Sequence, residues 1–132
     1  MDQIDRILSA SPFNLDAPGR DWVRATLSGM DRAAKVRQLF VHICFGTGPE
    51  VVQRITALEP AGITKFFGPD GAAELDTLDA LRAEAAIPYL VSSDLEGSRM
   101  SPSFGTEVPN PLALAAVDDV QASATIADIM AL

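Results

Sequence analysis

Two acids and an arginine stand close together behind a short apolar run in "IPYLVSSDLEGSRMSP", residues 87–102. Asp94 and Glu96 follow the run, Gly97 comes next, and Arg99 lies just beyond it. A carboxylate accepts hydrogen bonds and a guanidinium donates them, so the group suits a hydroxyl-rich ligand, and a glycine would let the backbone approach such a ligand closely. The alternative is structural: Asp94 caps a turn, while Glu96 and Arg99 form a solvated pair. The residue types alone leave both interpretations open.

The elements that position this stretch follow from the apolar pattern. Three runs have strand length and are rich in β-branched and aromatic residues: "LFVHICF" (39–45), "ITKFFG" (63–68) and "PYLVSS" (88–93). Helical patterns stand between them, "PEVVQRITAL" after the first run and "AAELDTLDALRAEAA" after the second. Alternating strands and helices predict βαβ units with a parallel sheet. The fold class is therefore α/β, and the continuous first run predicts a strand buried on both faces.

The flanking segments are patterned less strongly. Residues 1–20 are polar and contain prolines, so we interpret them as an N-terminal arm. Apolar residues recur at helical spacing over 21–38, with Gly29 as a break. Asp118 or Asp119 could cap a last helix. The apolar side of the helix predicted at 72–86 comprises Leu75, Leu78 and Leu81.

Two other patterns suggest sites, but neither is complete. "FGTGPE" places Gly-x-Gly after a strand, as in dinucleotide-binding turns, yet the position of the third glycine is Val51. His42 is the sole histidine in the sequence, and it would share a strand face with Cys44. A metal site needs further ligands at suitable spacing, and the sequence offers none. We therefore predict a plain strand-to-helix turn, a core histidine, and neither a metal nor another cofactor.

Composition limits the class of partner. The 132 residues suffice for one domain with a core, and 48% of them are hydrophobic against 21% charged. Ten basic and eighteen acidic residues give a net charge of −8 without a basic run, which argues against nucleic acid or an anionic membrane as partner. One cysteine excludes an internal disulfide. We find no signal-peptide pattern and no apolar stretch near the roughly 18 residues of a membrane span, so a cytoplasmic protein is expected.

Several stretches carry a family resemblance. "IPYLVSSDLEGSRM", followed by "FGTEVPNPLALAAVDD", resembles the N-terminal domain of glycoside hydrolase family 3. In that family a strand ends in Asp-x-Glu-Gly-Gly-Arg and leads through a Phe/Thr-x-x-Pro segment to an Ala-Leu-Ala-Ala helix. "LSGMDRAAKVRQLF" is similar to the family's N-terminal helix, and "AGITKFFGPDGAAELDTLDALRAEAAIP" to its second strand and the helix after it. The resemblance runs from Trp22 to Leu132, and Asp-x-Glu-Gly is typical of the β-N-acetylhexosaminidase branch.

The resemblance implies a retaining glycosidase that hydrolyses O-glycosyl bonds of a carbohydrate substrate, a β-linked amino sugar or glucoside. It implies that Asp94 binds sugar hydroxyls and that Arg99 fills the family's first arginine position, with Glu96 as a further substrate-binding residue. Two positions depart from the family pattern. Ser98 replaces the second glycine, and Pro102 stands where a second arginine usually grips the sugar.

The family's domain is a (β/α)₈ barrel, which typically needs about 250 residues. Three strands are predicted here, so we expect the first three βα units of a TIM-type barrel, incomplete, over residues 21–132. The family's nucleophile and acid/base lie on later strands and loops, so we assign no catalytic group. The chain alone is therefore expected to be inactive, and either to self-associate through an open sheet edge or to be partly unfolded. The alternatives are a non-catalytic α/β carbohydrate-binding or interaction domain and, disfavoured by the glycine pattern, a nucleotide-binding oxidoreductase.

Overall fold

The structure is a computed structural model that describes residues 3–131. The chain divides into two compact units, one up to Val36 and the other from Arg37 onward. The first contains helices α1 (Gln3–Ser9) and α2 (Ala17–Gly29) and most of the short helix α3 (Arg32–Arg37). All strands of the described part belong to the second unit.

The first unit is held together by local caps and by ion pairs to Asp5. The Asp16 side chain caps α2 and accepts a hydrogen bond from the Gly19 amide at 2.9 Å. Arg24 of α2 lies 2.9 Å from the carboxylate of Asp5 in α1. The predicted break at Gly29 is confirmed, because α2 ends there and α3 begins three residues later. Helix α1 lies within the segment that the sequence predicts to be an arm.

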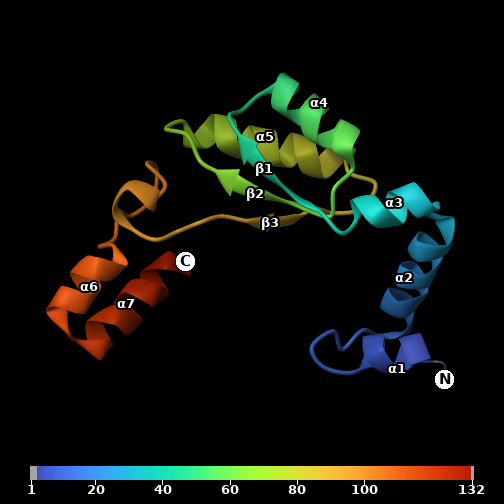
Figure 1. Ribbon diagram of the computed structural model, residues 1–132, viewed down its shortest axis with the longest axis horizontal. Helices are drawn as coiled ribbons and strands as arrows, with labels where there is room; N and C mark the ends of the chain where they lie inside the picture. The colour runs from blue at the N-terminus through green and yellow to red at the C-terminus, as the bar shows by residue number, and fades with distance from the viewer. Residues whose placement is uncertain (1–2, 132) are drawn as a thin grey trace. The chain divides into compact units, whose positions relative to one another are not determined.

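The second unit is built around a three-stranded parallel sheet in the order β1-β2-β3. Its strands are β1 (Val41–Phe45), β2 (Gly62–Phe66) and β3 (Leu90–Ser92). Helix α4 (Pro49–Leu58) connects the first two strands and α5 (Gly71–Glu84) the next two, and both helices lie on one face of the sheet (Figure 1). This arrangement confirms the predicted strand-helix alternation and the α/β class.

The core lies between the sheet and these two helices. Each layer contributes apolar side chains that are almost fully buried, and partly buried residues such as Leu78 and Tyr89 pack against them. The fully or nearly fully buried members of the core are Cys44, Val51, Val52, Ile55, Ile63 and Leu81.

Two burial predictions are wrong. Strand β1 is not buried on both faces: Cys44 is fully buried, whereas Ile43 is 59% exposed. Leu75 is 63% exposed, because the buried side of α5 is formed by Glu74, Thr77 and Leu81 instead. Helices cover one face of the sheet in the described residues, so side chains that alternate to the other face meet solvent.

The segment after β3 contains one turn of 3₁₀ helix (Ser98–Met100) and two helices, α6 (Pro111–Val117) and α7 (Val120–Met130), which contact each other. Asn110 caps α6, and Asp119 caps α7 by accepting from the Gln121 amide at 2.8 Å. Of the two caps that the sequence leaves open, Asp119 is therefore the one used. Among the helices of residues 3–131, none is long and apolar enough to cross a membrane.

Cys44 gives the core a dependence on alkaline pH. Its burial raises the pKa of the thiol above that of an exposed cysteine. Between the two pKa values the unfolded chain has lost the thiol proton while the folded chain retains it, so the free energy of unfolding falls as pH rises. We expect urea unfolding to show this loss above about pH 9, with Cys44→Ala reducing the slope against pH.

Tyr89→Phe is the necessary control, because burial also raises the pKa of the Tyr89 hydroxyl. The comparison concerns slopes and not absolute stabilities, so a cavity left by the alanine does not affect it. An unchanged slope in Cys44→Ala would contradict the expectation.

Candidate functional site

The charged segment 94–99 lies at the carboxyl edge of the parallel sheet. Asp94 follows the last residue of β3 by two positions, and open α/β sheets bind ligands outside this edge. Asp94 and Arg99 line the same cavity of about 60 Å³, together with Phe66 and Phe67. Glu96 does not line that cavity. The structure therefore brings two of the three expected sugar-binding residues together.

The charged side chains of this loop are not committed to structural bonds. Asp94, Glu96 and Arg99 are all exposed. No ion pair or side-chain hydrogen bond found within residues 3–131 involves any of them. The turn cap at Asp94 and the Glu96–Arg99 pair that a structural role requires are thus not formed there. Their donors and acceptors face water and remain available to a ligand.

Gly97 has a role different from the one that the sequence suggests. Its φ is +84°, and a Cβ at this position would lie 2.3 Å from the Pro109 carbonyl oxygen. The next amide, of Ser98, donates to the Val108 carbonyl at 2.6 Å. The absence of a side chain at Gly97 therefore makes room for the backbone of Val108 and Pro109, and not for a ligand. Ser98, which stands where the family has a second glycine, also has a positive φ of 47°.

A buried ion pair between β2 and α5 is the feature that sequence reasoning missed. Lys65 is fully buried, and its Nζ lies 2.6 Å from Oε2 of Glu74, which is also buried. The ammonium donates to the Gly46 carbonyl after β1 at 2.9 Å. The other carboxylate oxygen of Glu74 accepts from the Gly68 amide after β2 at 2.6 Å. One pair thus binds backbone groups from two of the loops at the carboxyl edge.

The loop that carries Asp94 is attached to the same region. The hydroxyl of Ser93 donates to the carbonyl of Lys65 at 2.7 Å, and that of Ser103 to the carbonyl of Gly68 at 3.2 Å. The ring of Phe104 packs edge-on against Phe67, with centroids 5.5 Å apart. Strand β2 and the turn after it therefore hold the loop at its start and again near Ser103.

The glycine-rich turn has an ordinary structural explanation. Gly46 and Gly48 have φ values of +79° and +90°, and the Gly48 amide donates to Oγ1 of Thr77 at 2.9 Å. Val51, at the position of the missing third glycine, packs into the core. The turn connects β1 to α4, as the sequence analysis predicts.

His42 is partly buried on the same strand face as Cys44, and its ring lies 6.3 Å from that of Phe40. Within the described residues, no group of three or more His, Cys, Asp or Glu side chains could hold a metal ion. The histidine therefore takes part in strand packing and does not belong to a cluster of potential ligands.

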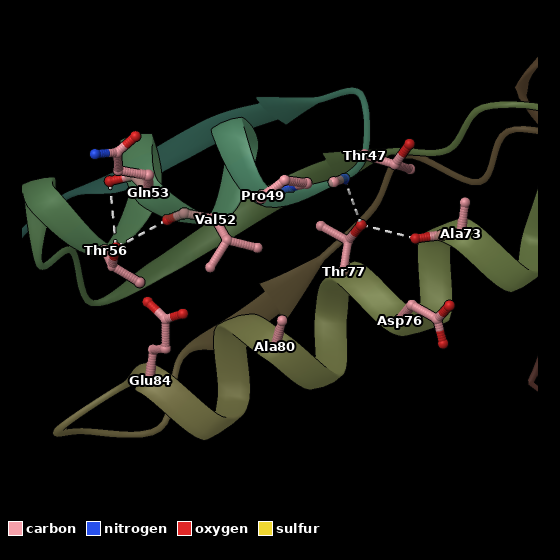
Figure 2. Close-up of a pocket in the computed structure, with 11 residues that line it drawn as sticks. Thr47, Pro49, Val52, Gln53, Thr56, Ala73, Asp76, Thr77, Ala80 and Glu84 are labelled. Atoms are coloured by element: carbon pink, nitrogen blue, oxygen red, sulfur yellow. Dashed lines mark hydrogen bonds between the residues drawn. The ribbon is translucent and has the colours of Figure 1, made fainter.

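A larger pocket, of about 570 Å³, lies between α4 and α5 (Figure 2). The hydroxyls of Thr56 and Thr77 point toward it but donate to carbonyls of their own helices. None of the three charged residues after β3 lines this groove. The groove is therefore separate from the cavity at Asp94.

A comparison with curated proteins identifies a relative. A protein of Cellulomonas fimi named beta-N-acetylglucosaminidase/beta-glucosidase is 36% identical to this chain over 126 residues. The match covers 90% of the chain but 22% of the relative, so the chain spans about a fifth of that protein's length. No family model matches the chain, and no solved structure does. The identity supports a relationship to glycoside hydrolases.

Gly97→Ala should destabilise the loop after β3. The substitution adds a Cβ next to the Pro109 oxygen and forces a positive φ on a residue that disfavours it, which costs about 1–3 kcal/mol. Thermal or urea unfolding would measure this loss. Gly105→Ala in the same loop is the matched control, because its φ is not positive and its nearest contact would be 3.6 Å. Equal stability of the two variants would contradict the role assigned to Gly97.

Proposed function

We propose that this chain forms part of the sugar-binding side of a glycoside hydrolase that acts on β-linked N-acetylglucosamine or glucose. The observation that carries the proposal is the shared cavity of Asp94 and Arg99 at the carboxyl edge of the sheet, where both side chains are free of structural bonds. The identity to a glycosidase over most of the chain supports it independently.

The proposal includes the finer assignment to glycoside hydrolase family 3 and its β-N-acetylhexosaminidase branch, with residues 21–132 as the first βα units of a (β/α)₈ barrel. The parallel order of the strands, with helices on one face, is compatible with such a barrel. In a barrel the opposite face, which carries Ile43 and Phe45, would turn inward.

Each charged residue has a proposed part in recognition. Asp94 accepts hydrogen bonds from sugar hydroxyls, and Arg99 donates to a hydroxyl or carbonyl oxygen across the same cavity. Glu96 lies outside the cavity and would contact a ligand that extends beyond it. Pro102 lines the cavity at the position of the family's second arginine, so that contact is replaced by an apolar one.

Asp94 and Glu96 are not proposed as a nucleophile and acid/base pair. A retaining glycosidase needs two carboxyl groups on opposite sides of the scissile bond, about 5–5.5 Å apart. These two stand on one loop, and Asp94 alone of the two lines the cavity. We assign them to binding and assign no group of these 132 residues to bond cleavage.

The binding proposal predicts that Asp94→Ala weakens sugar affinity. A hydrogen bond to a charged group contributes about 1.5–3 kcal/mol, so the dissociation constant should rise about 10- to 100-fold. Saturation-transfer NMR or calorimetry with N-acetylglucosamine and β-methyl glucoside would measure it. Glu107→Ala is the control, because Glu107 is an exposed acid of the same loop that does not line the cavity. Equal losses in both variants would exclude a specific role for Asp94.

A second prediction concerns cleavage. The 132-residue chain should not hydrolyse chromogenic N-acetyl-β-glucosaminides or β-glucosides, because neither group required for double displacement is assigned here. Turnover by the homogeneous protein would contradict this prediction. Loss of that turnover in Asp94→Asn would assign the chemistry to the loop itself.

A further inference from the structure

We infer that the buried pair of Lys65 and Glu74 is a positioning device that sets the place of the loop over residues 93–108, and with it Asp94 and Arg99. The inference deepens the proposed sugar site and rests on that function for its biological meaning. Neither residue touches the cavity itself. Their effect is exerted through backbone groups that they hold.

The pair does more than fill space in the core. Its two charged groups supply hydrogen bonds to the Gly46 carbonyl and the Gly68 amide, which belong to different loops of the carboxyl edge. Apolar residues of equal volume would pack against the same neighbours but leave both backbone groups without these partners. A buried ion pair costs desolvation energy, so its presence is better explained by the geometry it specifies than by stability.

Two hydroxyls carry that geometry to the sugar-binding loop. Ser93, the residue directly before Asp94, donates to the carbonyl of Lys65 itself. Ser103 donates to the carbonyl of Gly68, whose amide is held by Glu74. The loop is therefore attached at two points, and both points belong to residues of the ion-pair network.

The position of Ser93 in the chain explains why its bond matters for Asp94. Ser93 directly precedes Asp94, so the bond from its hydroxyl to the Lys65 carbonyl restrains the backbone from which Asp94 projects. The hydroxyl of Ser92, two residues before Asp94, lies 3.0 Å from the hydroxyl of Thr64 in β2. The two serines thus attach the chain to β2 directly before Asp94.

Amide hydrogen exchange, read by NMR on the 132-residue chain, tests the inference without a ligand. The variants are Lys65→Met/Glu74→Leu, which replaces the pair by apolar residues, and Ser93→Ala, which leaves the pair intact. The control is Asp79→Ala/Arg82→Ala, which removes an ion pair of the same helix whose side chains are 73% exposed. The reporting amides are those of Ser98 and Val108 in the loop, and the reference amides are those of Ile55 and Leu81 in the core.

We expect the loop amides to exchange about 2- to 10-fold faster in Ser93→Ala, the effect of one lost hydrogen bond, and about tenfold or more faster in the double variant. Core amides should change little in either protein relative to the loop, and the control should match wild type. Exchange that rises equally in loop and core, or not at all, would overturn the inference, because a merely stabilising pair affects both. If the double variant does not fold, Ser93→Ala still tests the link between the pair and the loop, and unchanged loop exchange in it would overturn the inference.

Sugar titration separates this inference from the proposed function. If wild type binds N-acetylglucosamine, both variants should bind it more weakly, about tenfold for the double variant, while the control binds normally. Normal sugar affinity in a variant with a loosened loop would overturn the positioning role. Absence of sugar binding by wild type would count against the proposed function, whereas the exchange result would still decide whether the pair holds the loop.

Discussion

The ion pair of Lys65 and Glu74 is the interaction on which the carboxyl edge of the sheet depends. Moving two charges from water into a protein interior costs several kcal/mol for each, and the attraction between them compensates only when further hydrogen bonds are made. Here the ammonium also binds the Gly46 carbonyl, and the carboxylate also binds the Gly68 amide. Glu74 lies in the first turn of α5, where the helix dipole favours a negative charge. Removing one partner would leave the other charge buried, at a cost of about 3–5 kcal/mol, so the turn after β2 is strongly constrained.

The sequence predicts those parts of the fold whose cause is local. The apolar runs of strand length, the helical pattern after the first run, and the Gly29 break each act within a few residues, and each prediction is confirmed. Burial is not local, because it depends on how many layers cover a sheet. The run at 39–45 would look the same with helices on one face or on both, so it could not reveal that Ile43 is exposed. The same limit explains the error at Leu75.

The site was predicted in part for a similar reason. Asp94 and Arg99 share a cavity, and their closeness in the sequence made this predictable. The backbone of Pro109 lies close to Gly97, and this contact depends on tertiary packing that the sequence motif does not contain. A signal for the ion pair did exist. Lys65 is two residues from the buried Ile63, so strand alternation places both side chains on the same face of the sheet. An acid, Glu74, follows in the first turn of the next helix.

The dimensions of the cavity explain why loop geometry should matter so much for recognition. Small-molecule sites usually have about 300–1,000 Å³ and bury most of the ligand, whereas the cavity at Asp94 has about 60 Å³. A sugar bound there would keep most of its surface in water, so little binding energy would come from apolar burial. The remaining contribution comes from a few hydrogen bonds to charged groups, and these weaken steeply when their angles are poor. A site of this kind gains affinity mainly by holding its carboxylate and guanidinium in place before the ligand arrives, which is the effect of a rigid turn beside the loop.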